Sequence, residues 1–199
     1  KGFHPLAYRM MCLQAHYRSE LEFSWDNLTA ALTRLKRMVM AVEHLKVRHA
    51  ELVSASTSDN AQTDEKWTLK RVQGDVGDRF APYIQRFDAA ISDELNTSVA
   101  LTVLDEATGL KKVDPGEKLK VIAAMDAVLG LNLLDLQRED LRIRPASATI
   151  TEAEIEAGLA RRKEARAAKD FAASDAIRDE LAAKGVDVMD GDPLGWEWK

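Results

Sequence analysis

Three side chains near the carboxyl end of the chain have the types and the spacing to recognise an unpaired nucleobase. Phe171, Asp175 and Arg178 lie at i, i+4 and i+7, which places them on one stripe of a helix. A phenyl ring offers a face on which a base can stack. A carboxylate accepts from the amino edge of guanine or cytosine, and a guanidinium donates bidentately to a base or a phosphate.

The same residues also fit an ordinary helix surface. Asp175 and Arg178 suit an i,i+3 ion pair, with Phe171 as a core residue. Residues 161–169, which precede them, hold five basic residues and one acidic residue. Such a run is usually a solvated helix face, but Arg166 and Lys169 at the expected helix end suit phosphate contacts. The residues alone leave both interpretations open.

A small helical unit is expected to position these side chains. The capping-box pattern TEAE at 151–154 begins a helix that should end near residue 168. A second helix should run from about 170 to 184, where a glycine follows. The apolar alternation at 186–188 and 196–198, with Gly and Pro between, predicts a short β-hairpin.

The first 145 residues have the pattern of a helical scaffold. Ser24 is a plausible N-cap for a long amphipathic helix, on whose polar side Arg34, Arg37 and Arg48 suit solvated packing more than contact with RNA. Residues 54–65 are polar and predict a loop, residues 67–78 are ambiguous, and the Pro/Ser-containing stretch 142–148 is a connector. The expected helices lie at about 5–16, 24–52, 78–94, 98–108 and 115–129.

Composition narrows the functional classes. The net charge is −5, so the whole molecule is not a general electrostatic binder of nucleic acid. Cys12 is the one cysteine, which excludes an intrachain disulfide and a zinc site of several thiolates, and its apolar neighbours predict a buried, inert thiol. No apolar run of about 18 residues predicts a membrane span. The chain begins at Lys1, which indicates that an initiator residue, a tag or a larger N-terminal part has been lost.

Four blocks in collinear order carry a family resemblance. Residues 2–28, 86–101 and 126–133, with residues 165–186 and the later Asp190, Gly195 and Trp198, resemble the C-terminal portion of bacterial cysteinyl-tRNA synthetases, which are class I aminoacyl-tRNA synthetases. The resemblance implies a mainly α fold with a helical bundle of the DALR type. A small helical module with a short β-hairpin would follow it.

The resemblance also implies a division and a function. Residues 1–23 would join the catalytic core, 24–145 would form the bundle and 146–199 the anticodon-recognition module. The chain would bind tRNA(Cys) in a cytoplasmic, monomeric cysteine–tRNA ligase, with no membrane partner. The implied nucleic-acid-binding residues are Arg166, Lys169, Phe171, Asp175, Arg178, Asp190 and Trp198, with Trp198 preferred to Trp196 as the family's terminal tryptophan.

Parts of the family pattern are missing from this sequence. It contains no HIGH-type motif, no KMSKS-type loop and no Cys/His/Glu cluster for zinc. We therefore expect no catalytic residue and no cofactor in this segment, while ATP, zinc and the catalytic domain in cis would belong to the parent enzyme. The segment alone should be inactive. The alternative is a stand-alone RNA-binding paralogue without activity, or a helical interaction module.

Charge refines the expectation for the C-terminal module. Residues 151–199 hold 8 basic and 12 acidic residues, a net charge of −4. Residues 161–170 hold 5 basic and 2 acidic residues, a net charge of +3. Phosphate contact is therefore confined to one helix end, and the acidic surroundings favour selective contacts with base edges over broad RNA affinity.

Overall fold

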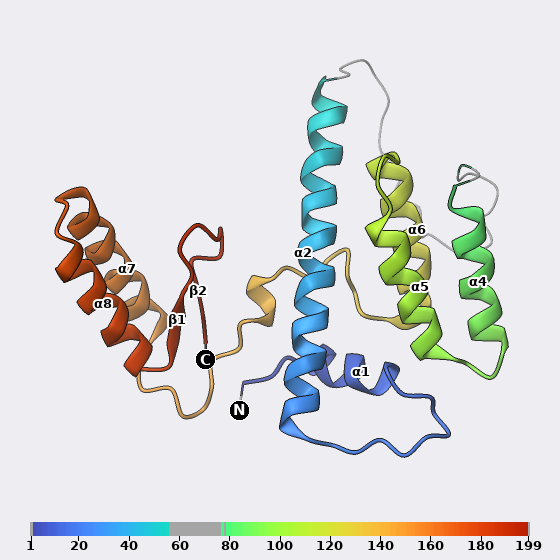
Figure 1. Ribbon diagram of the computed structural model, residues 1–199, viewed down its shortest axis with the longest axis horizontal. Helices are drawn as coiled ribbons and strands as arrows, with labels where there is room; N and C mark the ends of the chain where they lie inside the picture. Colours follow the sequence, from blue (N-terminus) through green and yellow to red (C-terminus); the bar gives the residue numbers. More distant parts are fainter. Residues whose placement is uncertain (1, 56–76, 78, 199) are drawn as a thin grey trace. The chain divides into compact units, whose positions relative to one another are not determined.

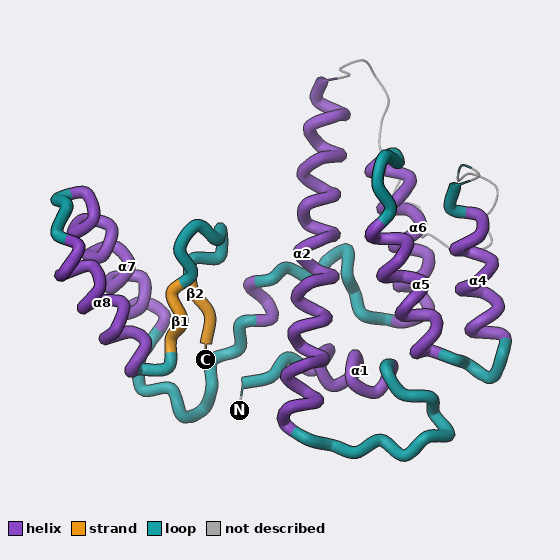
Figure 2. The backbone as a smooth tube through the Cα atoms, in the orientation of Figure 1, coloured by secondary structure: helices purple, strands orange, loops and turns teal. Residues whose placement is uncertain are grey.

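The computed structural model describes residues 2–55, 77 and 79–198, and within them it shows seven α-helices and a two-stranded antiparallel sheet (Figure 1; Figure 2). The mainly α fold class with a short β-hairpin is confirmed. The chain divides into two compact units, Pro5–Arg138 and Lys1–His4 with Glu139–Lys199. The division at 23 and 145, which follows the family resemblance, stays a prediction.

The larger unit is an α-helical bundle. Its helices are α1 (Pro5–Leu13), α2 (Trp25–Ala55), α4 (Ala81–Ser92), α5 (Thr97–Gly109) and α6 (Pro115–Leu129). Figure 1 shows α5 and α6 side by side, and α2 as the longest helix. Apolar side chains spaced three or four residues apart, such as Leu35, Val39 and Val42 of α2, are at most 1% exposed and form the core. None of the described helices is long and apolar enough to cross a membrane.

Local signals set the ends of these helices. Ser24 Oγ accepts from Asn27 N at 3.0 Å, which confirms the predicted N-cap of α2. This helix continues to Ala55, beyond the predicted end, and the rest of the loop expected at 54–65 lies outside the described residues, as do nearly all of residues 67–78. Gly130 ends α6 in the left-handed conformation, with φ +65°.

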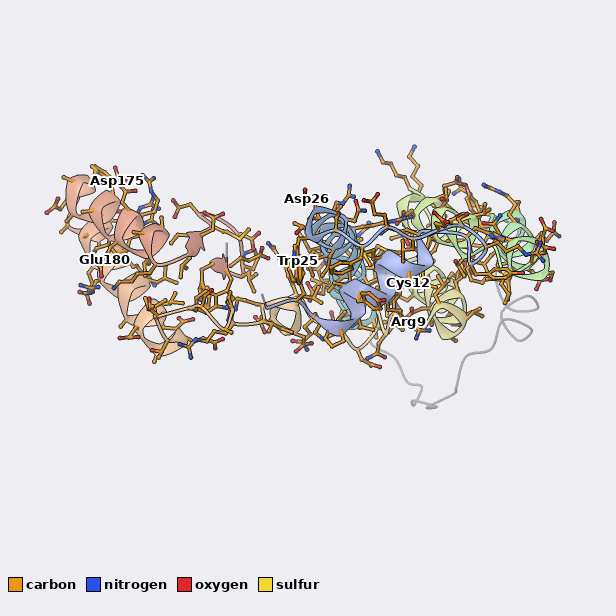
Figure 3. All side chains as sticks on the ribbon, turned by 90° about the horizontal axis from the view of Figure 1, so that it is seen from below. Arg9, Cys12, Trp25, Asp26, Asp175 and Glu180 are labelled. Carbon is orange, nitrogen blue, oxygen red and sulfur yellow. The ribbon has the colours of Figure 1, made fainter. Side chains whose placement is uncertain are left out.

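Two sequence expectations for α1 are wrong. The helix ends at Leu13, not near residue 16. Cys12 is exposed, because the buried positions of this helix are taken by Ala7, Met10 and Met11. Figure 3 labels Cys12 on α1. The three-to-four-residue period of the helix turns position 12 away from the stripe that Met10 and Met11 bury.

The carboxylate of Asp126 fixes the chain after α6. It accepts from Leu131 N at 2.8 Å and from Leu133 N at 2.6 Å. Burial raises the pKa of Asp126 even though these two amide donors act in the opposite direction. The Asp126 side chain therefore holds the segment after Gly130. Arg9 Nε donates a further hydrogen bond to Leu129 O, at the end of α6, at 2.8 Å.

The smaller unit is an antiparallel helix pair with a hairpin. Its elements are a 3-10 turn at Glu139–Leu141, α7 (Glu152–Ala167), α8 (Phe171–Ala183), β1 (Val186–Val188) and β2 (Trp196–Trp198). Val186 pairs with Trp198, and Val188 pairs with Trp196. The core of this unit consists of Ile150, Ile155, Leu181, Val186 and Trp196. The predicted capping box is confirmed, since Thr151 Oγ1 accepts from Glu154 N and Glu154 Oε2 accepts from Thr151 N.

Candidate nucleic-acid interface

A three-residue turn brings the end of α7 next to the start of α8. Lys169 adopts the left-handed conformation at φ +60°, and Asp170 N donates to Ala165 O at 2.9 Å. Asp170 Oδ1 then accepts from Ala173 N at 3.0 Å and caps α8. The turn therefore places the basic end of α7 beside Phe171, the first residue of α8.

The α8 stripe of Phe171, Asp175 and Arg178 lies on the surface of its unit. Phe171 is 65% exposed, so it is not a core residue. The i,i+3 ion pair is present, with 3.6 Å between Arg178 Nη1 and Asp175 Oδ1, and Arg178 also contacts Asp179 at 3.4 Å. Figure 3 labels Asp175 on α8. Exposed pairs of this kind contribute about 0–1 kcal/mol, so a base or a phosphate can displace them at little cost.

A bidentate ion pair joins α7 to the loop after β1. Arg162 donates from Nη1 to Asp190 Oδ1 at 2.5 Å and from Nη2 to Asp190 Oδ2 at 2.8 Å. Arg166 adds a contact from Nη2 to Asp190 Oδ2 at 3.0 Å. Hydrogen bonding by Arg162, with the charges of both arginines, lowers the pKa of Asp190 to about 2. Asp190 is therefore ionised at neutral pH and only accepts hydrogen bonds.

Arg162 is the functional candidate that the sequence analysis did not single out. Its side chain is only 6% exposed, whereas the basic run around it was expected to be a solvated face or a phosphate guide. Ile155 and Leu159 precede it by seven and three residues, a helical period that places Arg162 on the buried side of α7. That period was the signal available in the sequence.

Trp198 occupies a different environment from the other predicted residues. It lies in β2, is half-buried, and meets Trp196 edge to face with 5.1 Å between the ring centroids. Trp196 is 1% exposed, lies under the Arg142 guanidinium at 3.8 Å, and donates from Nε1 to Glu156 at 3.2 Å. No hydrogen bond or ion pair among the described residues joins Trp198 to the six other predicted residues.

The six remaining predicted residues form two groups. Arg166 and Asp190 are in direct contact, and Lys169 lies in the adjoining turn. Phe171, Asp175 and Arg178 share the exposed stripe of α8. Arg162 is bonded to Asp190 of the first group, and this hydrogen bond raises the pKa of its guanidinium. The arrangement can stack a base, accept from N–H donors and neutralise phosphate.

Comparisons with known proteins find similar sequences over the whole chain. Residues 151–193 match the family model described as the cysteinyl-tRNA ligase anticodon binding domain. The whole chain is 63% identical to a cysteine–tRNA ligase of Novosphingobium aromaticivorans, 36% of which it covers. It is 48% identical to that of Zymomonas mobilis, with 40% covered. Over 96% of its length it is 34% identical to cysteine–tRNA ligase 1 of Burkholderia lata, with 33% covered.

The mainly α fold and the family model over residues 151–193 indicate an anticodon-binding portion of an aminoacyl-tRNA synthetase. The particular proteins that the chain is similar to are cysteine–tRNA ligases, and the predicted resemblance to the C-terminal portion of the bacterial enzymes is confirmed. The chain spans between 33% and 40% of the length of the three relatives named above.

Proposed function

We propose that this chain binds tRNA(Cys) as part of a cysteine–tRNA ligase, and that its C-terminal unit recognises the unpaired bases of the anticodon loop. The observation that carries the proposal is the exposed α8 stripe within the matched residues 151–193. Phe171 is 65% exposed at the start of α8, and Asp175 and Arg178 follow on the same stripe. An exposed aromatic ring beside one acceptor and one donor suits a splayed-out base.

Each side chain has a distinct role in this proposal. Phe171 stacks on a base, and Asp175 accepts from an amino edge. Arg178 donates to a base or a phosphate, after leaving its exposed contacts with Asp175 and Asp179. Arg166 and Lys169, at the basic end of α7, neutralise phosphates. Because these residues touch RNA and no reacting atom, they contribute specificity and not the chemical step.

Asp190 and Trp198 complete the proposed set from the hairpin side. Asp190 offers an ionised carboxylate beside Arg166, which suits a base donor next to a phosphate. Trp198 is packed against the core of the unit, so its proposed contribution is to support the hairpin and present a ring edge.

The activity proposed for the longer enzyme is ATP-dependent attachment of cysteine to tRNA(Cys), in the cytoplasm and as a monomer. The catalytic part in cis would bind ATP and the zinc ion. Among the residues that the structure describes, no three His, Cys, Asp or Glu side chains form a possible metal site. The residues present therefore do not fit the zinc ion, and no step of the proposal depends on it.

The test measures RNA binding by fluorescence anisotropy. The probes are the anticodon stem–loop of tRNA(Cys) and a stem–loop with its anticodon replaced. We expect the chain to prefer the first RNA, and Phe171→Ala to weaken that binding by about 1–3 kcal/mol through lost stacking. Asp175→Ala and Arg178→Ala should reduce the preference. Asp187→Asn, which removes an exposed carboxylate of β1, is the control.

Three results would overturn the proposal or a part of it. Equal affinity for both RNAs would reject anticodon recognition by this chain, and no affinity for either would favour the helical interaction module. A clear preference that survives in all three stripe variants would reject the choice of residues. A chain that binds the cognate RNA, found encoded without a catalytic part, would instead be the stand-alone RNA-binding paralogue.

A further inference from the structure

The Arg162–Asp190 contact leaves the carboxylate with few free acceptor positions. A carboxylate offers about four lone-pair positions on its two oxygens. Arg162 occupies one on each oxygen, and Arg166 occupies a second one on Oδ2. Among the contacts of the described residues, one position therefore remains, on Oδ1. The Asp190 side chain is 45% exposed, so an RNA group can reach it.

We propose that Arg162 is a positioning residue for base recognition, which holds the Asp190 carboxylate in one orientation so that its remaining acceptor position selects a base presenting an N–H donor. This inference rests on the proposed function. Arg162 itself is buried and is not expected to touch RNA. It acts through Asp190, whereas the exposed residues of the α8 stripe act directly.

The rigidity of the guanidinium supports this role. Its planar fork bonds both oxygens at once and so fixes the rotation of the carboxylate plane, which a single contact does not do. Burial restricts the Arg162 side chain further, since only 6% of it is exposed. A lysine at this position would keep the positive charge and lose the bidentate geometry.

Arg166 shares the carboxylate but differs in exposure. Its side chain is 49% exposed, and it contacts Asp190 through one hydrogen bond of 3.0 Å from Nη2. It can turn to an RNA phosphate while Arg162 still holds Asp190 in place. Arg166 should therefore contribute affinity for RNA of any sequence, and Arg162 should contribute discrimination between bases.

The experiment compares base discrimination in matched variants of the full 199-residue chain. The RNAs are the cognate anticodon stem–loop and versions in which each anticodon base is replaced singly. Asp190→Asn should reduce discrimination at one base position by about tenfold. Arg162→Lys should lose discrimination at that same position and retain it elsewhere. The Arg162→Lys/Asp190→Asn double variant should lose no more discrimination than either single variant.

Matched controls separate positioning from folding. Arg161→Lys makes the same exchange at the neighbouring residue, whose side chain is 61% exposed, and should change nothing. The indole NMR signals of Trp196 and Trp198 report whether the unit is folded. If Arg162→Lys is unfolded, Asp190→Glu replaces it, since a longer carboxylate should misplace the same acceptor and produce the same one-position loss.

The outcomes distinguish this inference from the proposed function. Loss of affinity for every RNA in equal proportion in Arg162→Lys would show a structural role only and would overturn the inference. Unchanged discrimination in a folded Arg162→Lys variant would do the same. If the wild-type chain discriminates at no anticodon position, the proposed function itself fails. If Arg162→Lys and Asp190→Asn lose discrimination at the same single base position, the result supports both the inference and the proposed function.

Discussion

Arg162 and Asp190 lie 28 residues apart in the chain and are joined by two hydrogen bonds, of 2.5 and 2.8 Å. The two partners differ in solvent contact, since the Arg162 side chain is 6% exposed and the Asp190 side chain 45%. A buried cation that loses its partner cannot be rehydrated easily, whereas a half-exposed carboxylate can. The contact therefore ties the loop after β1 to α7, and we expect Asp190 to contribute to the stability of the smaller unit.

Removing Asp190 should destabilise the smaller unit more than removing its exposed partner. Asp190→Ala leaves the buried Arg162 guanidinium without its charge partner, and we expect a loss of about 2 kcal/mol in the free energy of unfolding. Arg166→Ala deletes a half-exposed contact to the same carboxylate and should cost about 0–1 kcal/mol. Urea unfolding followed by the indole NMR signals of Trp196 and Trp198 measures both. Equal losses would contradict the assignment of the buried contact as the dominant one.

The stability that Asp190 contributes should depend on pH. Its pKa falls from an ordinary value of 3.8 to about 2 in the folded chain, chiefly through Arg162. Because the folded pKa lies below the unfolded one, the contribution is complete above about pH 4 and is lost as the pH falls toward 2. Screening at this half-exposed carboxylate limits it to about 1 kcal/mol.

The measurement for this pH dependence is a series of urea unfolding curves between pH 2 and 6. The free-energy difference between the wild type and Asp190→Asn should be constant above pH 5 and should shrink as the pH falls from 4 to 2. A difference that stays constant down to pH 2 would show that Asp190 has no depressed pKa. Taking the difference cancels the titration of the other carboxylates, which both proteins share.

Lys169→Gly should have different effects on the stability of the chain and on its affinity for RNA. Lys169 adopts φ +60°, which costs a non-glycine residue roughly 1 kcal/mol. Glycine relieves that cost but gains more conformational freedom in the unfolded chain, so we expect a change between 0 and about +1 kcal/mol in stability. The lost charge should reduce the slope of log K against log salt by about 0.7–0.9.

The controls for Lys169→Gly test the turn and the charge separately. Lys169→Asn also removes the charge, and asparagine tolerates the left-handed conformation, so it should behave similarly. Lys184→Gln removes a charge that is paired with Glu180 at 2.8 Å and should leave the salt slope unchanged. A salt slope that is the same in wild type and Lys169→Gly would exclude a phosphate contact at Lys169.

A branched side chain at position 158 should destabilise the packing of α7 against α8. A Cβ at this position would lie 3.3 Å from Leu181 Cδ2, and Leu181 is 2% exposed. In Gly158→Ala the gain in helix propensity, about 1 kcal/mol, should offset this tight contact and leave stability nearly unchanged. Gly158→Val adds two further methyl groups and should destabilise the unit by about 1–3 kcal/mol.

The midpoint of thermal unfolding, followed by circular dichroism, distinguishes the two Gly158 variants. Alanine is the matched control, because it adds the Cβ without the branches. If valine were tolerated as well as alanine, Leu181 would have room to move and the close approach of the helices would not depend on Gly158. Helix propensity alone cannot produce a difference of the predicted size, since the propensities of alanine and valine differ by well under 1 kcal/mol.

Much of the fold could be predicted from local patterns in the sequence. The N-cap at Ser24, the capping box at Thr151 and the stop at Gly130 depend on residues within one helical turn, and all three are present. The β-hairpin followed from apolar alternation and a Gly/Pro turn. The predicted burial of Cys12 was wrong, because its neighbours Met10 and Met11 occupy the buried positions of α1 and Cys12 is exposed.

The sequence by itself determined the stripe of Phe171, Asp175 and Arg178, because helical spacing alone places them on one face. It did not determine whether that stripe faces solvent or the core. In the structure Leu181 packs in the core of the unit, and Phe171 is exposed. The tertiary structure alone decided that Arg162 is bonded to Asp190. A contact between residues 28 apart depends on how the core places α7 and the loop after β1, and no local spacing encodes that distance.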